Sequence, residues 1–153
     1  MSLSKISLAT ALVVGTLATG ALAQDRNPAV DARQGHMQIM SLNLGILGNM
    51  ARGNTDYDAA VAQAAADNLV AMGMVSQRFY WPPGTDSENY EGSRALPALW
   101  ENQALVFEIG GRYTPAAEAL AAAAGQGLDA MRGAIGPVGA VCGDCHEAFQ
   151  QER

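Results

Sequence analysis

The sequence predicts an all-α protein whose helices pack together as a bundle. The chain of 153 residues is rich in alanine and poor in aromatic residues, and this composition favours helix over sheet. Its apolar residues recur at alternating intervals of three and four, which is the spacing of helices with one buried face. Glycine, asparagine and proline divide the periodic part of the chain into four stretches. We therefore expect four bundle helices.

Residues 1–23 are predicted to be a secretory signal peptide. Lys5 precedes an apolar run that ends in Ala-Leu-Ala before Gln24, and a basic start, an apolar stretch and a small-x-small site are typical of a cleaved signal. A membrane anchor is the alternative, although glycines and threonines interrupt the run. We expect one mature domain, residues 24–153, in the periplasm, and no membrane span after signal removal.

The charge of the predicted mature domain argues against nucleic acid as a partner. This part of the chain has eight arginines, no lysine and 15 acidic residues, so its net charge is −7. Binding to the phosphates of a nucleic acid needs a basic surface. No serine–histidine–acid or phosphate-loop pattern is visible either, and we expect a binding protein and not an enzyme.

The first predicted helix spans residues 29–51 and ends at Gly53-Asn54. Its buried face follows the spacing Val30, Arg33, Met37, Met40, Leu44, Leu47, Ala51. Arg33 is unsuited to a core, because a buried guanidinium without an anion is strongly destabilising. No acidic residue lies one turn away on that face, so we expect a non-local partner. The alternative is that Arg33 extends to solvent near the helix end.

The second predicted helix spans about residues 57–79, with Thr55 or Asp56 as its cap. A long loop with two adjacent prolines follows, residues 80–97. The third helix starts at the last proline of this loop, a favourable first-turn residue. It then bends or restarts at Gly110-Gly111.

The last predicted helix, residues 127–149, carries both cysteines and one of the two histidines of the chain. They form the sequence Cys142-Gly143-Asp144-Cys145-His146. Both cysteines lie on the apolar stripe of the helix, which also includes Leu128, Met131, Ile135, Val138 and Phe149. Pro137 removes one backbone donor and is expected to bend the helix one turn before the first cysteine.

Cys-x-x-Cys-His is the attachment signature of a c-type haem. Residues three and four apart share a helix face, so Cys142 and Cys145 can form thioethers with two vinyl groups on one porphyrin edge, while His146 supplies a nitrogen to iron. A disulfide or a redox-active dithiol would leave His146 without a task. Zinc is a further alternative, for which His36 is the only other nitrogen donor.

A haem motif near the end of the last of four helices resembles the cytochrome c′ family. The segment ARQGHMQIMSLNLG is similar to the Arg-Gln segment that faces the haem in that family, PPGTD and SRALPALW to its loop, and VGAVCGDCHEAF to its haem helix. The resemblance implies an antiparallel four-helix bundle with one covalent haem c held by the C-terminal helix. It also implies a homodimer in many members, for which Gly45, Gly48 and Ala51 could allow close contact.

By position, the resemblance makes Cys142 and Cys145 the covalent attachments and His146 the axial iron ligand. The residues it places in contact with the haem are Arg33, Gln34, Met37 and Arg94. It places Arg33 at a haem propionate, a carboxylate that a guanidinium binds with two hydrogen bonds.

The resemblance implies a five-coordinate, largely high-spin haem that binds small diatomic gases such as nitric oxide and carbon monoxide or takes part in electron transfer with redox partner proteins. Met37 lies where the family covers the open side of iron, so we expect it to act as a movable lid. The alternative is a low-spin electron carrier in which Met37 ligates iron. A thiol–disulfide oxidoreductase without haem is a more remote alternative. Gln150 departs from the family, in which the residue after the aromatic of this motif is usually basic.

Other conspicuous residues have structural explanations. His36 lies about 100° around the helix from Met37 and off the apolar stripe, so we expect it in solvent or at a subunit contact. Trp81 and Trp100 are expected to pack beside the loop and the core. The remaining methionines at helical spacing are expected to fill the core.

Overall fold

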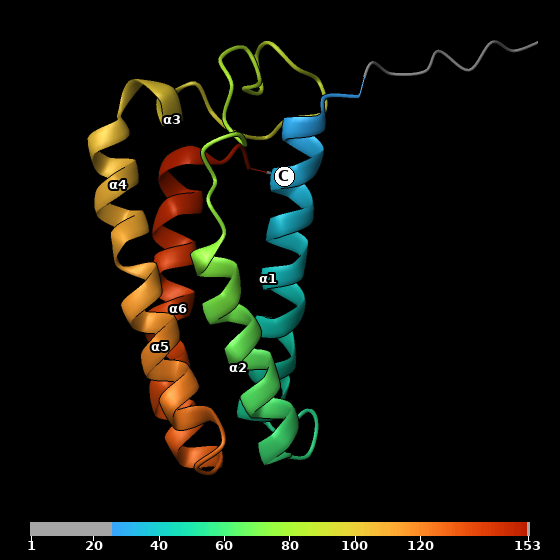
Figure 1. Cartoon of the computed structure of the whole chain (residues 1–153), viewed down its shortest axis with the longest axis vertical. Coiled ribbons are helices and arrows are strands. Elements are labelled where there is room, and N and C mark those ends of the chain that lie inside the picture. Colours follow the sequence, from blue (N-terminus) through green and yellow to red (C-terminus); the bar gives the residue numbers. More distant parts are fainter. Residues whose placement is uncertain (1–25, 153) are drawn as a thin grey trace, which may run out of the picture.

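A computed structural model describes residues 26–152 of the chain, and its ordered elements are all helices (Figure 1). The predicted signal peptide lies outside the described residues. The helices are α1 (Pro28–Arg52), α2 (Ala59–Met74), α3 (Ala98–Glu101), α4 (Gln103–Gly111), α5 (Tyr113–Ala124) and α6 (Leu128–Phe149). With α4 and α5 stacked end to end, they form the predicted antiparallel four-helix bundle, so the fold class is confirmed. Within residues 26–152, no helix combines the length and the apolar character needed to cross a bilayer.

Side-chain and glycine caps set the ends of the first two helices. The Asn27 side chain accepts hydrogen bonds from the first backbone N–H groups of α1, and Gly53 ends that helix with a φ of 74°, in the left-handed region that glycine tolerates. The side chain of Asp58, and not of Thr55 or Asp56, caps α2. The helix ends at Met74, five residues before the predicted end at Phe79.

The early end of α2 follows from the path of the next segment. Val75 has extended backbone angles, and the N–H of Tyr80 donates to the carbonyl of Gln77 in a turn. This turn directs the chain across the top of α1, where the Tyr80 carbonyl accepts a hydrogen bond from Arg33. The contact between Arg33 and Tyr80 is thus formed in place of the last turn of α2 that local periodicity predicts.

The third predicted helix is three pieces. The helix is interrupted at Arg112, between α4 and α5. This agrees with the predicted restart near Gly110-Gly111, which was the alternative to a bend. The helix also breaks at Asn102, whose side chain caps the N-terminus of α4 by accepting from the Leu105 N–H at 3.3 Å. By contrast, α6 continues through Pro137 without interruption.

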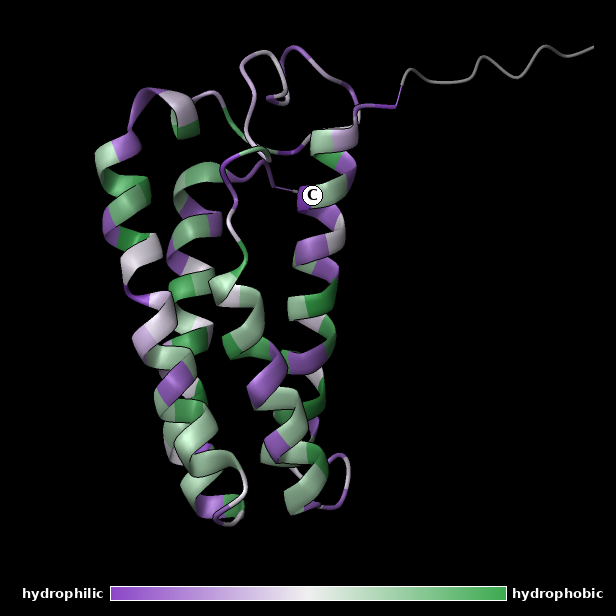
Figure 2. Cartoon of the chain, in the orientation of Figure 1, coloured by the Kyte–Doolittle hydropathy of each residue, from purple (hydrophilic) through white to green (hydrophobic). Residues whose placement is uncertain are grey.

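The core is densest where α2 and α5 pack against the lower turns of α1 and α6. The largest fully buried side chains are Val30, Leu47, Leu69, Leu120, Met131 and Val138. All of these except Val30 lie in this lower part of the bundle, which we call the closed half. Figure 2 shows apolar residues predominating on α2, α5 and α6, and hydrophilic residues concentrated in the loop above the bundle and in the first turns of α1.

Candidate functional site

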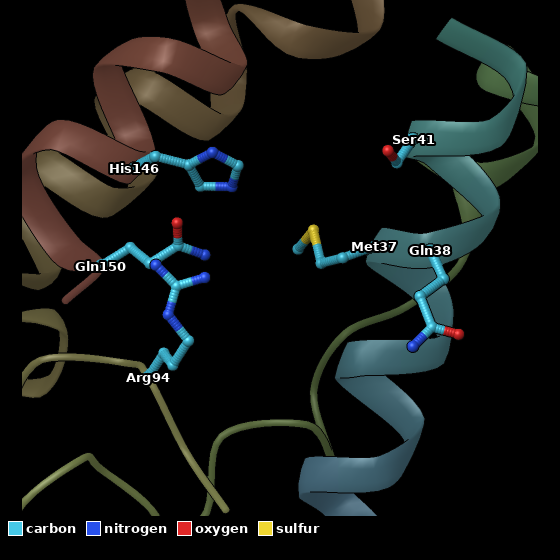
Figure 3. Close-up of a pocket in the computed structure, with 6 residues that line it drawn as sticks. All are labelled: Met37, Gln38, Ser41, Arg94, His146 and Gln150. Carbon is cyan, nitrogen blue, oxygen red and sulfur yellow. The ribbon is translucent and has the colours of Figure 1, made fainter. Parts of the chain in front are cut away.

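The other half of the bundle holds a cavity between α1 and α6 (Figure 3). Its volume is about 510 Å³, within the usual range of small-molecule and cofactor sites. Six residues line the cavity. Three come from α1, one from the long loop and one from α6, and one is the residue directly after α6: Met37, Gln38, Ser41, Arg94, His146 and Gln150. We call this part of the molecule the open half.

Two side chains with metal-binding chemistry face each other across the cavity. The imidazole of His146 projects from α6 and the sulfur of Met37 is directed toward it from α1 (Figure 3). Both side chains are exposed, and 37% of the Met37 surface is accessible. Within residues 26–152, no three His, Cys, Asp or Glu side chains converge as a metal site, so the zinc alternative lacks a ligand set there.

The two cysteines are free, half-buried thiols on α6, and neither is among the residues that line the cavity. Burial raises the pKa of the Cys142 thiol, and burial with the neighbouring Cys142 charge raises the pKa of Cys145. A redox-active dithiol normally has the opposite property, a thiol pKa lowered by a helix N-terminus or a nearby cation. The raised pKa values therefore do not favour the thiol–disulfide oxidoreductase alternative.

Arg33 is buried, with 4% of its surface exposed, so it does not extend to solvent. Its guanidinium donates to four oxygens of the long loop: Tyr80 O at 3.1 Å, Thr85 Oγ1 at 2.9 Å, Thr85 O, and Ser93 Oγ at 2.7 Å. Burial lowers the pKa of Arg33, and the charge of Asp86 partly opposes that effect. The non-local partner in this structure is thus the loop itself.

Two tryptophans complete the Arg33 environment. The guanidinium carbon lies 4.9 Å from the ring centroid of Trp81 and 6.0 Å from that of Trp100, within the range of cation–π attraction. The two indoles meet edge to face at 6.2 Å, and Trp100 Nε1 donates to the Trp81 carbonyl at 3.0 Å. Their predicted role as packing residues is confirmed.

Gln34 and Arg94 both connect to the long loop but in different ways. Gln34 Nε2 donates to the Gly92 carbonyl at 2.6 Å, so its amide is directed to the loop. Arg94 lines the cavity and also donates to the Gln151 carbonyl, while the Gln151 N–H donates back to the Arg94 carbonyl at 2.8 Å. An isolated antiparallel bridge between Ala95 and Gln150 adjoins this pair. The loop is therefore fastened to both walls of the open half.

Of the four predicted haem-contacting residues, Met37 and Arg94 line the cavity, whereas the hydrogen bonds of Arg33 and Gln34 run to the loop. Sequence reasoning missed Gln38 and Ser41 as cavity residues. Ser41 lies four residues after Met37, so helical spacing alone could have placed Ser41 on the same face of the helix as Met37.

His36 is not solvated, contrary to the prediction. Only 3% of its surface is exposed, and its ring packs edge to face against Tyr80 with centroids 5.6 Å apart. Neither ring nitrogen has a hydrogen-bond partner among the described residues, and burial lowers the His36 pKa. The prediction failed because it considered α1 alone, and the loop that covers this face comes from far along the chain.

Comparison with known proteins identifies similar chains over most of this length. The family described as Cytochrome C' matches residues 28–150. A cytochrome c-554 from Cereibacter sphaeroides is 40% identical over 148 residues, covering 94% of this chain and 96% of its own. Among solved structures, a cytochrome c' from Rhodobacter Spheriodes has a TM-score of 0.79 and 34% identity, covering 82% of this chain and 96% of its own. A carbon monoxide-bound variant of cytochrome c prime from Alcaligenes xylosoxidans has a TM-score of 0.69 and 30% identity, covering 81% and 94%.

Proposed function

The chain belongs to the cytochrome c′ family, and we propose that it is a periplasmic c-type haem protein that binds small diatomic gases such as nitric oxide and carbon monoxide or takes part in electron transfer. The observation that carries this proposal is the pairing of the His146 imidazole and the Met37 thioether on opposite walls of one cavity (Figure 3). The proposed role is ligand binding and electron transfer, with redox partner proteins, and not catalysis.

The residues around the cavity fit a covalent haem. Cys142 and Cys145 offer two free thiols on one face of α6, and would hold the group through thioethers. His146 would supply the axial nitrogen to iron, and the guanidinium of Arg94 lies at the cavity to meet a carboxylate. A haem held here would supply an iron that binds gases or carries one electron.

The predicted haem contacts of Arg33 and Gln34 remain predictions. In the structure, their hydrogen bonds hold the loop that carries Arg94. We propose that they position the edge of the haem site through this loop, because the loop is fastened to α1 by these side chains and to the end of α6 by its bridge. A direct propionate contact of Arg33 would require some of these hydrogen bonds to be exchanged.

A second candidate function is electron transfer by a low-spin haem with Met37 as the sixth ligand. The direction of the Met37 sulfur toward His146 favours it, and the 40% identical relative is named cytochrome c-554 and not cytochrome c′. A thioether ligand would raise the reduction potential and close the gas site. In the first candidate, Met37 instead covers the open side of iron and moves when a gas enters.

Mass and absorption measurements on the purified periplasmic protein test the proposal. The intact mass should exceed that of the mature polypeptide by one haem, and the reduced protein should be largely high-spin and bind carbon monoxide. A low-spin spectrum with a methionine–iron charge-transfer band that disappears in Met37→Ala assigns the second candidate. A mass equal to that of the bare chain, with reactive thiols, would overturn both.

We also propose a homodimer that uses the outer face of α1. Ile39 and Leu42 are 48% and 65% exposed on this helix, and Gly45 faces open space. Gly48 does not contribute as expected, because the Arg52 guanidinium of the same chain lies 3.0 Å from where its Cβ would be. Sedimentation should give the dimer mass, and Leu42→Glu should give the monomer. A wild-type protein that remains monomeric at high concentration contradicts this assembly.

A further inference from the structure

We propose that Ser41 determines ligand specificity, by donating a hydrogen bond from its hydroxyl to the outer atom of a diatomic ligand held in the cavity. The inference rests on the proposed function, because it concerns the same cavity. It assigns a role to a residue that neither the haem motif nor the helical stripe of apolar residues singles out.

The position of Ser41 on α1 places it beside the Met37 side of the cavity. Ser41 follows Met37 by four residues, so the two side chains are neighbours on one face of the helix. Both line the cavity, and the Ser41 hydroxyl points from α1 toward the wall that carries His146 (Figure 3). A ligand that takes the place of the Met37 side chain, opposite His146, would therefore have Ser41 as its neighbour.

The Ser41 hydroxyl has no hydrogen-bond partner among the described residues. Serine inside a helix often donates to the backbone carbonyl four residues earlier, which here belongs to Met37. Within residues 26–152, no side-chain hydrogen bond is formed by Ser41, whereas Arg33, Gln34 and Asn43 on the same helix all donate to protein oxygens. The hydroxyl is thus available to a molecule in the cavity.

The chemistry of a hydroxyl suits this role. It rotates freely and can donate one hydrogen bond, and hydrogen-bond donors near the open side of a haem decide which ligands bind and how long they stay. A donor at the outer atom stabilises ligands that accumulate negative charge there. The net value of one such bond corresponds to about a two- to tenfold change in the dissociation rate.

Gln38 provides an internal comparison. It lines the same cavity, but its side chain is directed along α1 and away from the space between Met37 and His146 (Figure 3). Its amide has more donors than the Ser41 hydroxyl. If any polar group in the cavity were sufficient, Gln38 would have at least the effect of Ser41.

The experiment uses the full haem-loaded protein and carbon monoxide as the probe. Ser41→Ala should raise the C–O stretching frequency in the infrared spectrum and speed carbon monoxide dissociation about two- to tenfold. Ser41→Thr retains the hydroxyl and should stay close to the wild type. Gln38→Ala also changes the cavity lining, but because its side chain is directed away from the ligand it should shift the frequency less than Ser41→Ala does. The stretching frequency reports the electrostatic field at the ligand, so it separates the loss of a donor from a loss of stability, and Ser41→Thr tests whether the hydroxyl is the source of the shift.

The same Ser41 variants are also made in a Met37→Ala background, so that a methionine bound to iron does not prevent the measurement. Stretching frequencies that are identical with and without Ser41→Ala in both backgrounds would overturn the role of Ser41 while leaving the haem function intact. An equal or larger shift in Gln38→Ala would overturn it in favour of a diffuse polar effect. Carbon monoxide that binds in neither background would overturn the gas-binding proposal together with this inference.

Discussion

The closed and open halves of the bundle use the same helices in opposite ways. On α1, Leu47 is fully buried in the closed half, whereas Met37 in the open half is 37% exposed. On α6, Met131 and Val138 are fully buried, but His146, two turns beyond Val138, is exposed to the cavity. The helical spacing of α1 and α6 is continuous across both halves. The difference in burial between the halves therefore depends on what the inner face of each helix packs against.

The interior of the closed half is filled by side chains of the chain itself, whereas the open half surrounds a cavity. In the closed half, apolar side chains fill the interior and stabilise the fold directly. In the open half, the loop is fastened by polar contacts to Arg33 and to the end of α6, and the cavity walls present an imidazole, a thioether and a guanidinium. Substitutions in the core of the closed half, or of the residues that fasten the loop in the open half, should therefore change stability. Substitutions of the residues that line the cavity should change ligand chemistry.

The largest effect on stability is expected from Leu120→Ala in the closed half. Leu120 is completely buried, and removing a large core side chain leaves a cavity that costs about 2–5 kcal/mol. Denaturant unfolding of the haem-loaded protein measures it. The control Met74→Ala changes a side chain that is 74% exposed and should stay within about 0.5 kcal/mol of the wild type. Equal effects of the two variants would contradict the placement of Leu120 in a tightly packed core.

Arg33→Leu should destabilise the protein by about 2–4 kcal/mol, because four loop oxygens lose a charged donor in a buried setting. Amide hydrogen exchange in residues 80–93 should accelerate, since the loop loses its attachment to α1. The exposed Arg78, which lies over the ring of Phe79 at 5.7 Å, supplies the control Arg78→Leu. A shifted reduction potential with unchanged loop exchange would instead support a direct propionate contact.

Tyr113→Phe should cost about 1 kcal/mol. The Tyr113 hydroxyl donates to the Leu69 carbonyl at 2.9 Å between α5 and α2. Burial, and secondarily the charge of Cys142, raises the pKa of Tyr113 from 10.0 to about 12. The proton is thus held more tightly in the folded state, and this contribution to stability is complete below pH 10 and is lost as the pH rises toward 12.

An ultraviolet titration of tyrosinate measures this shift. A thioether at Cys142 removes the secondary cause, so burial alone should delay the ionisation of one tyrosine in the haem-loaded protein. Unfolding free energies of wild type and Tyr113→Phe should converge above pH 10. A difference that grows with alkaline pH would contradict the raised pKa.

The smallest effect on stability, within about 0.5 kcal/mol, is expected from Met37→Ala in the open half. The same substitution should speed carbon monoxide binding, because less material has to move out of the cavity. Met40, half-buried against the core, gives the reverse control. Met40→Ala should lower stability and leave the binding rate unchanged, and the opposite assignment of these two effects would refute the role of Met37 as a lid.

Local sequence was sufficient for the fold class, because the spacing of apolar residues depends only on helical geometry. It also singled out His146, which the structure places at the cavity, whereas haem attachment at Cys142 and Cys145 stays a prediction. Helix ends that depend on nearby caps, such as the end of α1 at Gly53, were also close to the prediction.

Only the tertiary structure decided what surrounds the site. Arg33 was recognised as anomalous from its position in a stripe, but its partners lie 47 to 60 residues away in the loop. The same loop buries His36, which α1 by itself would leave in solvent, and Ser41 becomes a cavity residue only because α6 places His146 opposite it. The physical reason is range. Periodicity specifies which side of a helix is buried, whereas the identity of the contacting groups depends on chain segments that are brought together by folding of the whole bundle.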